Sequence, residues 1–553
     1  MRKLASAVAL CVGCSLVSVS AVDAQGRGGG TWSTAGGDAQ LSGWQKSEPR
    51  LTRDNAKDIK FLWKLKLGSG EVTQPSEPLF GGHIITNYGF KDVAIVFGPG
   101  NTLTSVDYEL GTILWQRKIP TDSAPACPTG QLTADVIQPA PTFAARGRGP
   151  AGAPVQIPPP PPPLEPRIGA GLSGPAGGGL GSIRGIFLLT ADGNLHEQNL
   201  VNGWDLGAPI KYLAPNSNLS VPTIGGASIY ASTSGGCGSA PSGVFTVDMS
   251  TAAYQKASYQ TGSVGVTGTD GPALSTDGKT LYVTTGSGTA SGEVHANSVV
   301  ALDSKTLSVR GYYTPSGADA SAKSNVSVSP VVFSYKGHDL VAAYVAGGRL
   351  ALLDGASLGG SDHRTALAIT AALSKDSAGA WGRLASAEDS GGTRFIYVSV
   401  HGAVATDAKL PTSNGAAADG AIVAFKVQDD GGKATLTPVW VSPNVPDPSP
   451  ASVVMNAPPP NVDNFGQPLP APAGTPPAVK AGGMVFTLSE GEAGKTHARL
   501  YAFDAETGAQ VFSSADGITA SADRASISIS GAHVLLLTSD NTLYAFGIAY
   551  DRD

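Results

Sequence analysis

Arg499-Leu-Tyr-Ala-Phe-Asp-Ala-Glu-Thr-Gly-Ala-Gln-Val-Phe512 is the stretch that decides the fold. In it an apolar run ends at Asp504, a turn closes on Gly508, and a second apolar run ends in an aromatic residue. The same pattern recurs along the chain, plainly at Leu103–Trp115 and more weakly at Val244–Asp248, Val299–Asp303 and Leu350–Asp354. Repetition of one small β unit predicts an array of identical modules.

Each repeat reads as four short strands over about 50 residues, which is the pattern of a β-propeller blade. The repeats are centred on Asp107, Asn199, Asp248, Asp303, Asp354, Phe425, Asp504 and Phe546. They predict an all-β, eight-bladed β-propeller of four-stranded antiparallel blades, with seven blades as the alternative. The last repeat lacks its outer strand, whereas Phe61–Leu67 is a strand without a repeat. We therefore expect the N-terminal strand to complete the last blade, which removes two open sheet edges.

Composition excludes several classes of protein. The 553 residues include 72 Gly and 40 Pro, and only 14% are charged, which argues against a helical bundle. The net charge of −6 provides no basic stripe for nucleic acid. The chain has no Cys-x-x-Cys-His motif, so covalent c-type haem is excluded, and no His pair has the spacing of a zinc site.

The first residues are typical of a targeting segment. A basic start at Arg2-Lys3, the mostly apolar stretch Leu4–Val19 and small residues before Gln25 predict a signal peptide at residues 1–24. An uncleaved anchor is the alternative, but the apolar run is shorter than the ~20 residues that a bilayer requires. Cys14 could be the lipidated residue of a lipoprotein, but Cys11 stands where the lipidation motif has Leu, so lipoprotein anchoring is disfavoured. We expect export to a bacterial periplasm or beyond, and no later segment could span a membrane.

The mature chain, residues 25–553, is expected to form one propeller domain. Export leaves Cys127 and Cys237, which predict one disulfide in an oxidising compartment. Both lie in loops that leave the same face of a propeller, the face of the inter-blade and second-to-third-strand connections, here called the loop face. We expect excursions at 404–418 and 443–477 to join them there. A further Pro- and Gly-rich insertion lies at about 146–181.

Other recurring residues have structural interpretations. Trp63, Trp115 and Trp440 fall at outer-strand positions and are expected to pack one blade on the next. The repeat aspartates are expected to stabilise turns through side-chain to backbone hydrogen bonds. Asp362-His363 lies in a turn without a nucleophile-elbow motif, so it does not predict catalysis.

The N-terminal part resembles a known family. Trp32-Ser-Thr-Ala-Gly-Gly-Asp38, followed by Leu51–Trp63, resembles the signature of pyrroloquinoline-quinone (PQQ) dehydrogenases, with Ile59 where Leu is usual. Ala502–Gly508 resembles the repeat of that superfamily, and Leu352–His363 is similar to secreted PQQ-binding-like propellers. The resemblance covers most of residues 31–548 and implies a quinoprotein-like propeller.

This resemblance implies two function classes. Its alcohol dehydrogenases stack the quinone between a tryptophan and a disulfide of adjacent cysteines, and hold calcium on a Glu, an Asn and an Asp. The chain has no adjacent cysteines, and no complete calcium set aligns. Another branch of the superfamily is non-catalytic and includes an outer-membrane assembly scaffold, so membership alone does not imply an activity.

The candidate site residues occupy equivalent places in their repeats, at the start of the strand that lines the central channel. They are Gln74, Glu77, Asn218, Asp270, Asn325, Trp381 and Arg383. The oxygens of Glu77, Asp270 and Asn325 are candidate Ca²⁺ ligands, and Asp270 is also the candidate catalytic base. Trp381 could stack on a flat ring and Arg383 could bind a carboxylate of PQQ, while the two remaining amides would contact the cofactor. The alternative is that these residues only solvate strand ends.

The sequence thus favours a non-catalytic propeller that binds a protein, peptide or glycan on its loop face. The alternative is a PQQ- and calcium-dependent dehydrogenase that oxidises a small alcohol or sugar and passes electrons to a separate acceptor.

Overall fold

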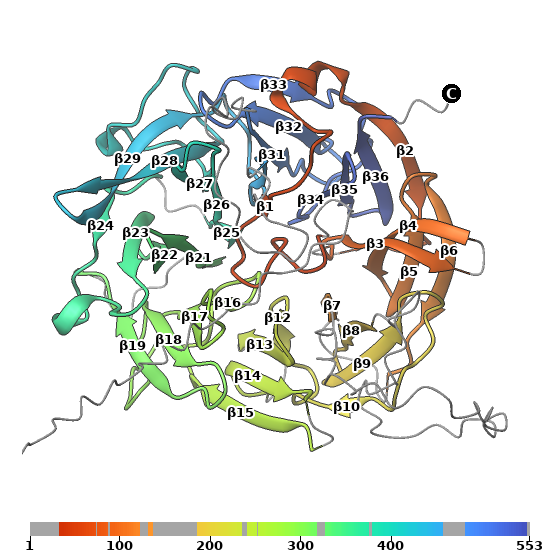
Figure 1. Ribbon diagram of the computed structural model, residues 1–553, viewed down its shortest axis with the longest axis horizontal. Helices are drawn as coiled ribbons and strands as arrows, with labels where there is room; N and C mark the ends of the chain where they lie inside the picture. The colour runs from red at the N-terminus through yellow and green to blue at the C-terminus, as the bar shows by residue number, and fades with distance from the viewer. Residues whose placement is uncertain are drawn as a thin grey trace, which may run out of the picture.

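Eight antiparallel sheets surround a central axis in the computed structural model of the protein (Figure 1). The structure describes residues 32–72, 75–86, 89–121, 131–136, 185–234, 240–250, 253–317, 327–374, 379–456 and 482–549. The predicted all-β, eight-bladed propeller is confirmed. None of the helices in these ranges has the length and apolar character needed to cross a bilayer.

The strands of each blade are given from the axis outwards. Blade 1 has β3 (Leu79–Thr86), β4 (Gly89–Gly98), β5 (Thr102–Asp107) and β6 (Thr112–Lys118), and blade 2 has β7 (Gln131–Val136), β8 (Gly185–Leu189), β9 (Asn194–Asn199) and β10 (Ile210–Lys211). Blade 3 has β11 (Asn218–Leu219) and β12 (Thr223–Gly225) beside β13 (Ser228–Ser234), then β14 (Gly243–Asp248) and β15 (Gln255–Gln260), and blade 4 has β16 (Ala273–Leu274), β17 (Thr280–Thr284), β18 (Val299–Asp303) and β19 (Val309–Tyr313).

Blade 5 has β21 (Val331–Tyr335), β22 (His338–Val345), β23 (Arg349–Asp354) and β24 (Ala368–Ile369), and blade 6 has β26 (Ala385–Glu388), β27 (Arg394–His401), β28 (Gly420–Asp430) and β29 (Lys433–Val441). Blade 7 has β30 (Ser452–Val454), β31 (Met484–Ser489), β32 (Arg499–Asp504) and β33 (Gln510–Ser513), and blade 8 has β34 (Ser528–Ser530), β35 (His533–Leu537), β36 (Thr542–Gly547) and β2 (Lys60–Lys66). The remaining elements are the strands β1 (Trp44–Gln45), β20 (Ser327–Ser329) and β25 (Trp381–Arg383) and the 3-10 turns η1 (Arg53–Asp58), η2 (Gly360–Asp362) and η3 (Thr406–Ala408).

The repeat predicted the blades correctly. Every predicted repeat centre lies in the third strand of a blade, from Asp107 in β5 to Phe546 in β36. β2 pairs antiparallel with β36, with Leu65 opposite Leu543, so the N-terminal strand completes blade 8 and closes the ring as expected. The repeat aspartates cap turns: Asp504 Oδ1 accepts hydrogen bonds from the backbone N–H groups of Glu506 and Thr507.

The outer-strand tryptophans link neighbouring blades. Trp63 of blade 8 donates from Nε1 to the Tyr108 carbonyl oxygen of blade 1 at 2.9 Å. Gly111 lies against this indole with φ of 63°, and a Cβ there would meet the ring at 2.6 Å, so a side chain at this position is excluded. The arrangement recurs as Trp115 with Leu200 and Gly203, and as Trp440 with Ala505 and Gly508.

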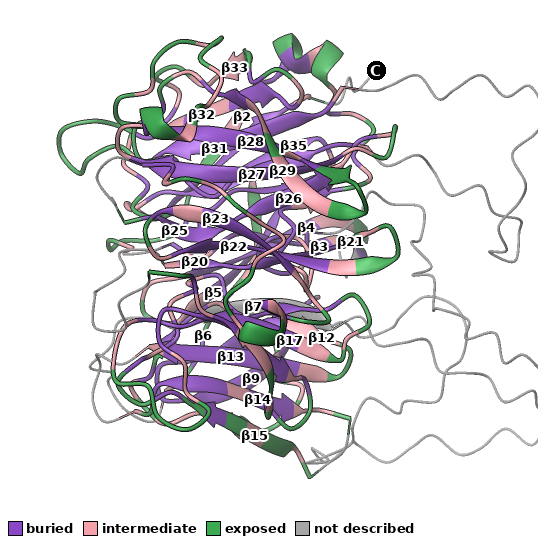
Figure 2. Ribbon diagram, turned by 90° about the vertical axis from the view of Figure 1, so that its left-hand side faces the viewer, coloured by how far each residue is buried: buried purple, intermediate pink, exposed green. Residues whose placement is uncertain are grey.

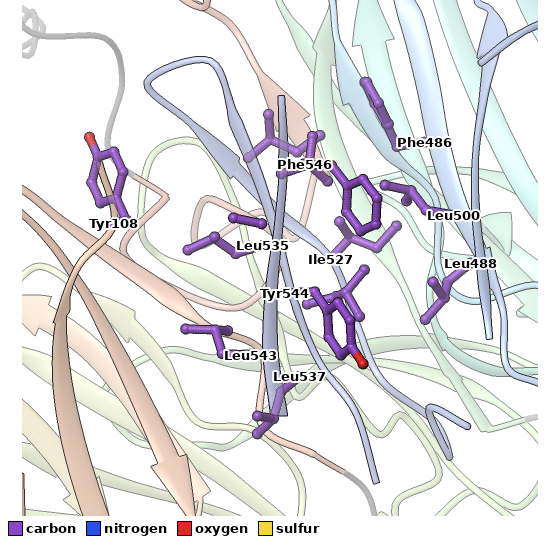
Figure 3. Close-up of a cluster of buried hydrophobic side chains, with 14 of the residues drawn as sticks. Tyr108, Phe486, Leu488, Leu500, Ile527, Leu535, Leu537, Leu543, Tyr544 and Phe546 are labelled. Carbon is purple, nitrogen blue, oxygen red and sulfur yellow. The ribbon is translucent and has the colours of Figure 1, made fainter. Parts of the chain in front are cut away.

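The hydrophobic core lies between blades. Alternate side chains of a strand point to opposite faces of its sheet, so each blade packs on both of its neighbours. Figure 3 shows this between blades 7 and 8, where Phe486 and Leu488 of β31 point towards Tyr544 and Phe546 of β36. In the side view the strands are mostly buried and the exposed residues concentrate in the connections (Figure 2). This packing leaves the axis to polar groups, described below.

The structure corrects one expectation about the loops, because the 443–477 excursion contains a strand. Residues 402–419 join the second and third strands of blade 6 and leave the loop face as predicted. The 443–477 excursion, however, is interrupted by β30, the innermost strand of blade 7. Its part before β30 lies in the connection between blades 6 and 7, and residues 457–477 lie outside the described residues. The three-residue strand β30 was hidden in a Pro-rich stretch.

Several predicted features lie outside the described residues. They are the signal peptide, Cys127 and Cys237, the 146–181 insertion, and residues 457–477 of the second excursion. The Cys127–Cys237 disulfide therefore stays a prediction.

Deletion of residues 25–70 removes β2 and its tryptophan and reopens two sheet edges. We expect this variant to aggregate or to show a large fall in melting temperature by differential scanning calorimetry. A control that lacks only residues 1–24 should melt like the full chain. Equal melting of the two variants would contradict closure by the N-terminal strand.

Candidate functional site at the propeller axis

The segment 32–45, here called the strap, crosses the middle of the ring (Figure 1). Its carbonyl oxygens accept hydrogen bonds from inner-strand N–H groups of five blades, namely blades 1, 4, 5, 6 and 7, at 2.7 to 3.1 Å. The donor–acceptor pairs, in the same order, are Phe80–Trp32, Leu274–Ala39, Val332–Gln40, Ser386–Ser42 and Val453–Gly43. β1 within the strap also pairs in parallel with β30. The strap therefore satisfies backbone groups that would otherwise face the channel unpaired.

A second set of backbone bonds joins neighbouring blades near the axis. Val221 N–H donates to Thr269, Thr269 N–H to Ser327, and Ser327 N–H to Ala380. β20 of blade 5 and β25 of blade 6 also pair in parallel. These bonds link blades 3, 4, 5 and 6 and hold β25, which carries two predicted site residues, in a fixed register.

Arg383 in β25 forms the centre of the site. Its Nη1 lies 2.9 Å from Glu77 Oε2 and 2.6 Å from Asp270 Oδ2, and its Nη2 donates to Ser452 Oγ at 3.3 Å. The Arg383 side chain is 0% exposed, that of Glu77 4% and that of Asp270 7%. Three of the predicted residues, from blades 1, 4 and 6, thus meet in one buried ion cluster.

The strap covers this cluster. Trp32 Nε1 donates a hydrogen bond to Glu77 Oε1, and the Gly36 N–H donates to the same oxygen at 3.4 Å. Gly36 has φ of 69°, and a Cβ there would lie 2.9 Å from Arg383 Cδ. The glycine of the N-terminal signature therefore allows the strap backbone to rest directly on the arginine.

Burial dominates the electrostatics of the cluster. Burial raises the pKa of Glu77 to about 7; Arg383 opposes this shift and Asp270 adds to it. Burial also disfavours the charged guanidinium, but the two carboxylates outweigh this and raise the pKa of Arg383. One guanidinium thus faces two carboxyl groups, one of which is close to protonation at neutral pH.

The cluster does not fit a calcium-bound quinone. A Ca²⁺ ion coordinated by Glu77 and Asp270 would have to stand where the Arg383 guanidinium bridges them, and the two cations repel. Arg383 is already paired with the chain's own carboxylates, so it is not free for a quinone carboxylate. In the described ranges no group of three His, Cys, Asp or Glu side chains could hold a metal ion.

The other predicted residues lie apart from the cluster. Trp381 is 6% exposed and donates from Nε1 to Glu490 Oε1 at 2.8 Å, so its ring is not an open stacking surface. Asn218 is exposed and donates to Ser234 Oγ at 2.9 Å. Gln74 and Asn325 lie outside the described residues.

Sequence reasoning missed a second polar group on the loop face, between blades 6 and 7. It comprises His401 at the end of β27, Asp447 in the inter-blade connection, and Glu490 after β31. His401 Nδ1 lies 3.6 Å from Asp447 Oδ1. A histidine directly after the apolar run Phe395–Val400 was the available signal, because it marks a polar group at the end of a buried strand.

A cleft on the same face lies between blades 4 and 5 and is lined by Thr267, Thr284, Thr285, Asn297, Ser298, Tyr344, Val345 and Ala346. Its cavity volume is about 10 Å³, which is room for about one water molecule and far too little for a tricyclic cofactor.

Comparison with solved structures agrees with this architecture. The chain has the fold of the quinoprotein dehydrogenase propellers. A quinohemoprotein alcohol dehydrogenase from Comamonas testosteroni matches with a TM-score of 0.54 and 11% identity over 95% of this chain and 81% of the other. A quinohemoprotein alcohol dehydrogenase from Pseudomonas putida matches with 0.53 and 12% over 95% and 81%. A europium-containing methanol dehydrogenase matches with 0.55 and 12% over 94% and 98%.

These likenesses show the fold alone, since the identities are so low. No family model matches the chain, and a search of curated proteins finds no match.

Arg383→Met should destabilise the protein strongly, because it leaves two buried carboxyl groups without their cation. Breaking a buried ion pair in this way costs about 3–5 kcal/mol, which urea denaturation can measure. Arg310→Met is the matched control, since it removes an arginine from a solvent-exposed pair with Asp303. The control should lose less than about 1 kcal/mol. Similar losses in the free energy of unfolding of both variants would show that the buried cluster stabilises the protein no more than the exposed pair does.

Glu77→Gln should flatten the dependence of stability on pH. The pKa of Glu77 is raised from 4.5 to about 7, so between these values the folded protein holds a proton that the unfolded chain has released. The free energy of unfolding of the parent should therefore fall as pH rises from about 4.5 to 7, and this contribution should level off above 7. Denaturation series at several pH values measure both proteins. Parallel profiles would contradict a raised pKa at Glu77.

Proposed function

We propose that the protein is an exported, non-catalytic β-propeller that acts as a binding scaffold. The observation that carries this proposal is the Arg383 cluster, in which a guanidinium stands between the two carboxylates that a calcium site would need. The strap covers the same cluster through Trp32 and Gly36. The most polar part of the axis thus serves to join blades 1, 4 and 6.

The loop face is the surface we propose for a partner, which would be a protein, peptide or glycan. The inter-blade and second-to-third-strand connections gather there, and such connections can vary without disturbing the blades. Export through residues 1–24 to the periplasm or the extracellular space, and a Cys127–Cys237 disulfide on this face, are part of the same proposal.

A PQQ- and calcium-dependent oxidoreductase is the second candidate, supported by the fold likeness to alcohol and methanol dehydrogenases. It would require Arg383 to release both carboxylates and Trp381 to turn from Glu490. Both changes leave buried polar groups without partners, so the first proposal has the stronger physical support.

Calorimetric titration of the full chain with PQQ and Ca²⁺ tests the choice. We expect no heat of binding, because the guanidinium competes with the metal for the same carboxylates. Trp381→Ala tests the predicted stacking residue, and Trp204→Ala, which changes an exposed indole in the connection between β9 and β10, is its control. Sub-micromolar binding that Trp381→Ala abolishes and Trp204→Ala retains would overturn the proposal.

A further inference from the structure

The seam between blades 6 and 7 on the loop face carries polar groups that the fold does not require. Phe395, Tyr397 and Ser399 of β27 face blade 7, and His401 continues this row at the end of the strand. The first two are packed in the apolar core, and Ser399 Oγ donates to the Ser449 carbonyl oxygen. His401 is the member of the row whose ring reaches the level of the loops.

Among the described residues, one ring nitrogen of His401 has no hydrogen-bond partner. The side chain is 5% exposed, and Nδ1 lies 3.6 Å from Asp447 Oδ1. Nε2 is buried and makes no hydrogen bond within the described part of the chain. A buried polar atom without a partner is costly, and native proteins rarely keep one unless a ligand or a water satisfies it.

Two carboxylates border this histidine. Glu490 lies close enough to His401 to interact electrostatically, and it accepts hydrogen bonds from Trp381 Nε1 and from the Arg524 backbone. Asp447 has φ of 43° and a side chain that is 70% exposed. Among the described residues, no lysine or arginine forms an ion pair with either carboxylate.

A divalent metal is not the best match for this seam. In the described ranges no three His, Cys, Asp or Glu side chains converge closely enough to hold a metal ion. A guanidinium is wider, since it spreads five N–H donors over a rigid planar fork and can reach acceptors that do not meet at one point. It also supplies the positive charge that the two carboxylates lack.

We propose that the seam formed by His401, Asp447 and Glu490 binds an arginine side chain of a partner protein. The fork donates to the two carboxylates and to the free Nε2 of His401, and it enters past the exposed side chain of Asp447. This inference rests on the proposed function, because it names the partner chemistry recognised on the loop face. Trp381 has a positioning role, since its Nε1–H holds the Glu490 carboxylate at the seam.

Calorimetric titration with a Gly/Ser peptide that carries four arginines tests the proposal on the full chain. We expect binding by the parent and none with the same peptide in which citrulline, a neutral analogue of the same shape, replaces arginine. Glu490→Gln and Asp447→Asn should each weaken binding by at least about tenfold, which is 1.4 kcal/mol. His401→Phe, which keeps a ring but removes the acceptor, should also weaken binding.

Glu492→Gln is the matched control, because it removes one charge from the same loop at a residue that is already paired with Lys495. Its affinity should equal that of the parent, and melting temperatures should show that every variant is folded. Absence of binding by the parent, or equal losses in Glu490→Gln and Glu492→Gln, would overturn the proposal. PQQ and Ca²⁺ are titrated into the same samples. If the parent binds both PQQ and the arginine peptide, the scaffold function is refuted and this inference stands. If the parent binds neither, this inference is refuted and the scaffold function stands.

Discussion

The buried contact of Arg383 with Glu77 and Asp270 is the interaction on which the centre of the molecule depends. A propeller has its apolar core between blades, so the inner strands present polar groups to the central axis. Here one guanidinium joins three blades, and the strap accepts backbone hydrogen bonds from five. Charge pairing and backbone pairing thus satisfy polar groups at the axis. The N-terminal segment joins the blades at the axis through the strap and at the outer edge through β2.

Much of the fold could be predicted because its determinants are local. The turn from Asp504 to Gly508 is defined by residues four positions apart, and the tryptophan of an outer strand packs on the same turn of the next blade. The strand β30 was not recognised, since three residues in a Pro-rich stretch carry no periodic signal. As a result, residues 443–477 were interpreted as one loop, whereas β30 divides them.

The site was harder to predict for a physical reason. Glu77, Asp270 and Arg383 were selected as axial residues, and they do meet. Their pairing with each other, in place of a cofactor, depends on separations of more than a hundred residues and on the strap that covers them. His401 and Glu490 belong to no repeat, so only the packed structure reveals that they share a seam with Asp447. The chain therefore shares the fold of the dehydrogenase propellers, and three of its own axial side chains pair with one another.

Native-state hydrogen exchange of the strap, followed by mass spectrometry, measures this use of the axis most directly. Amides of Gly37, Leu41 and Gly43 are hydrogen-bonded within the strap, and those of Phe80 and Val332 donate into it. We expect all of them to exchange as slowly as the buried strand β35, because they should open only when the ring itself opens. Exchange of the strap as fast as that of the exposed loop at 412–416, in a protein whose blades remain protected, would contradict the view that the strap and the Arg383 cluster hold the propeller together.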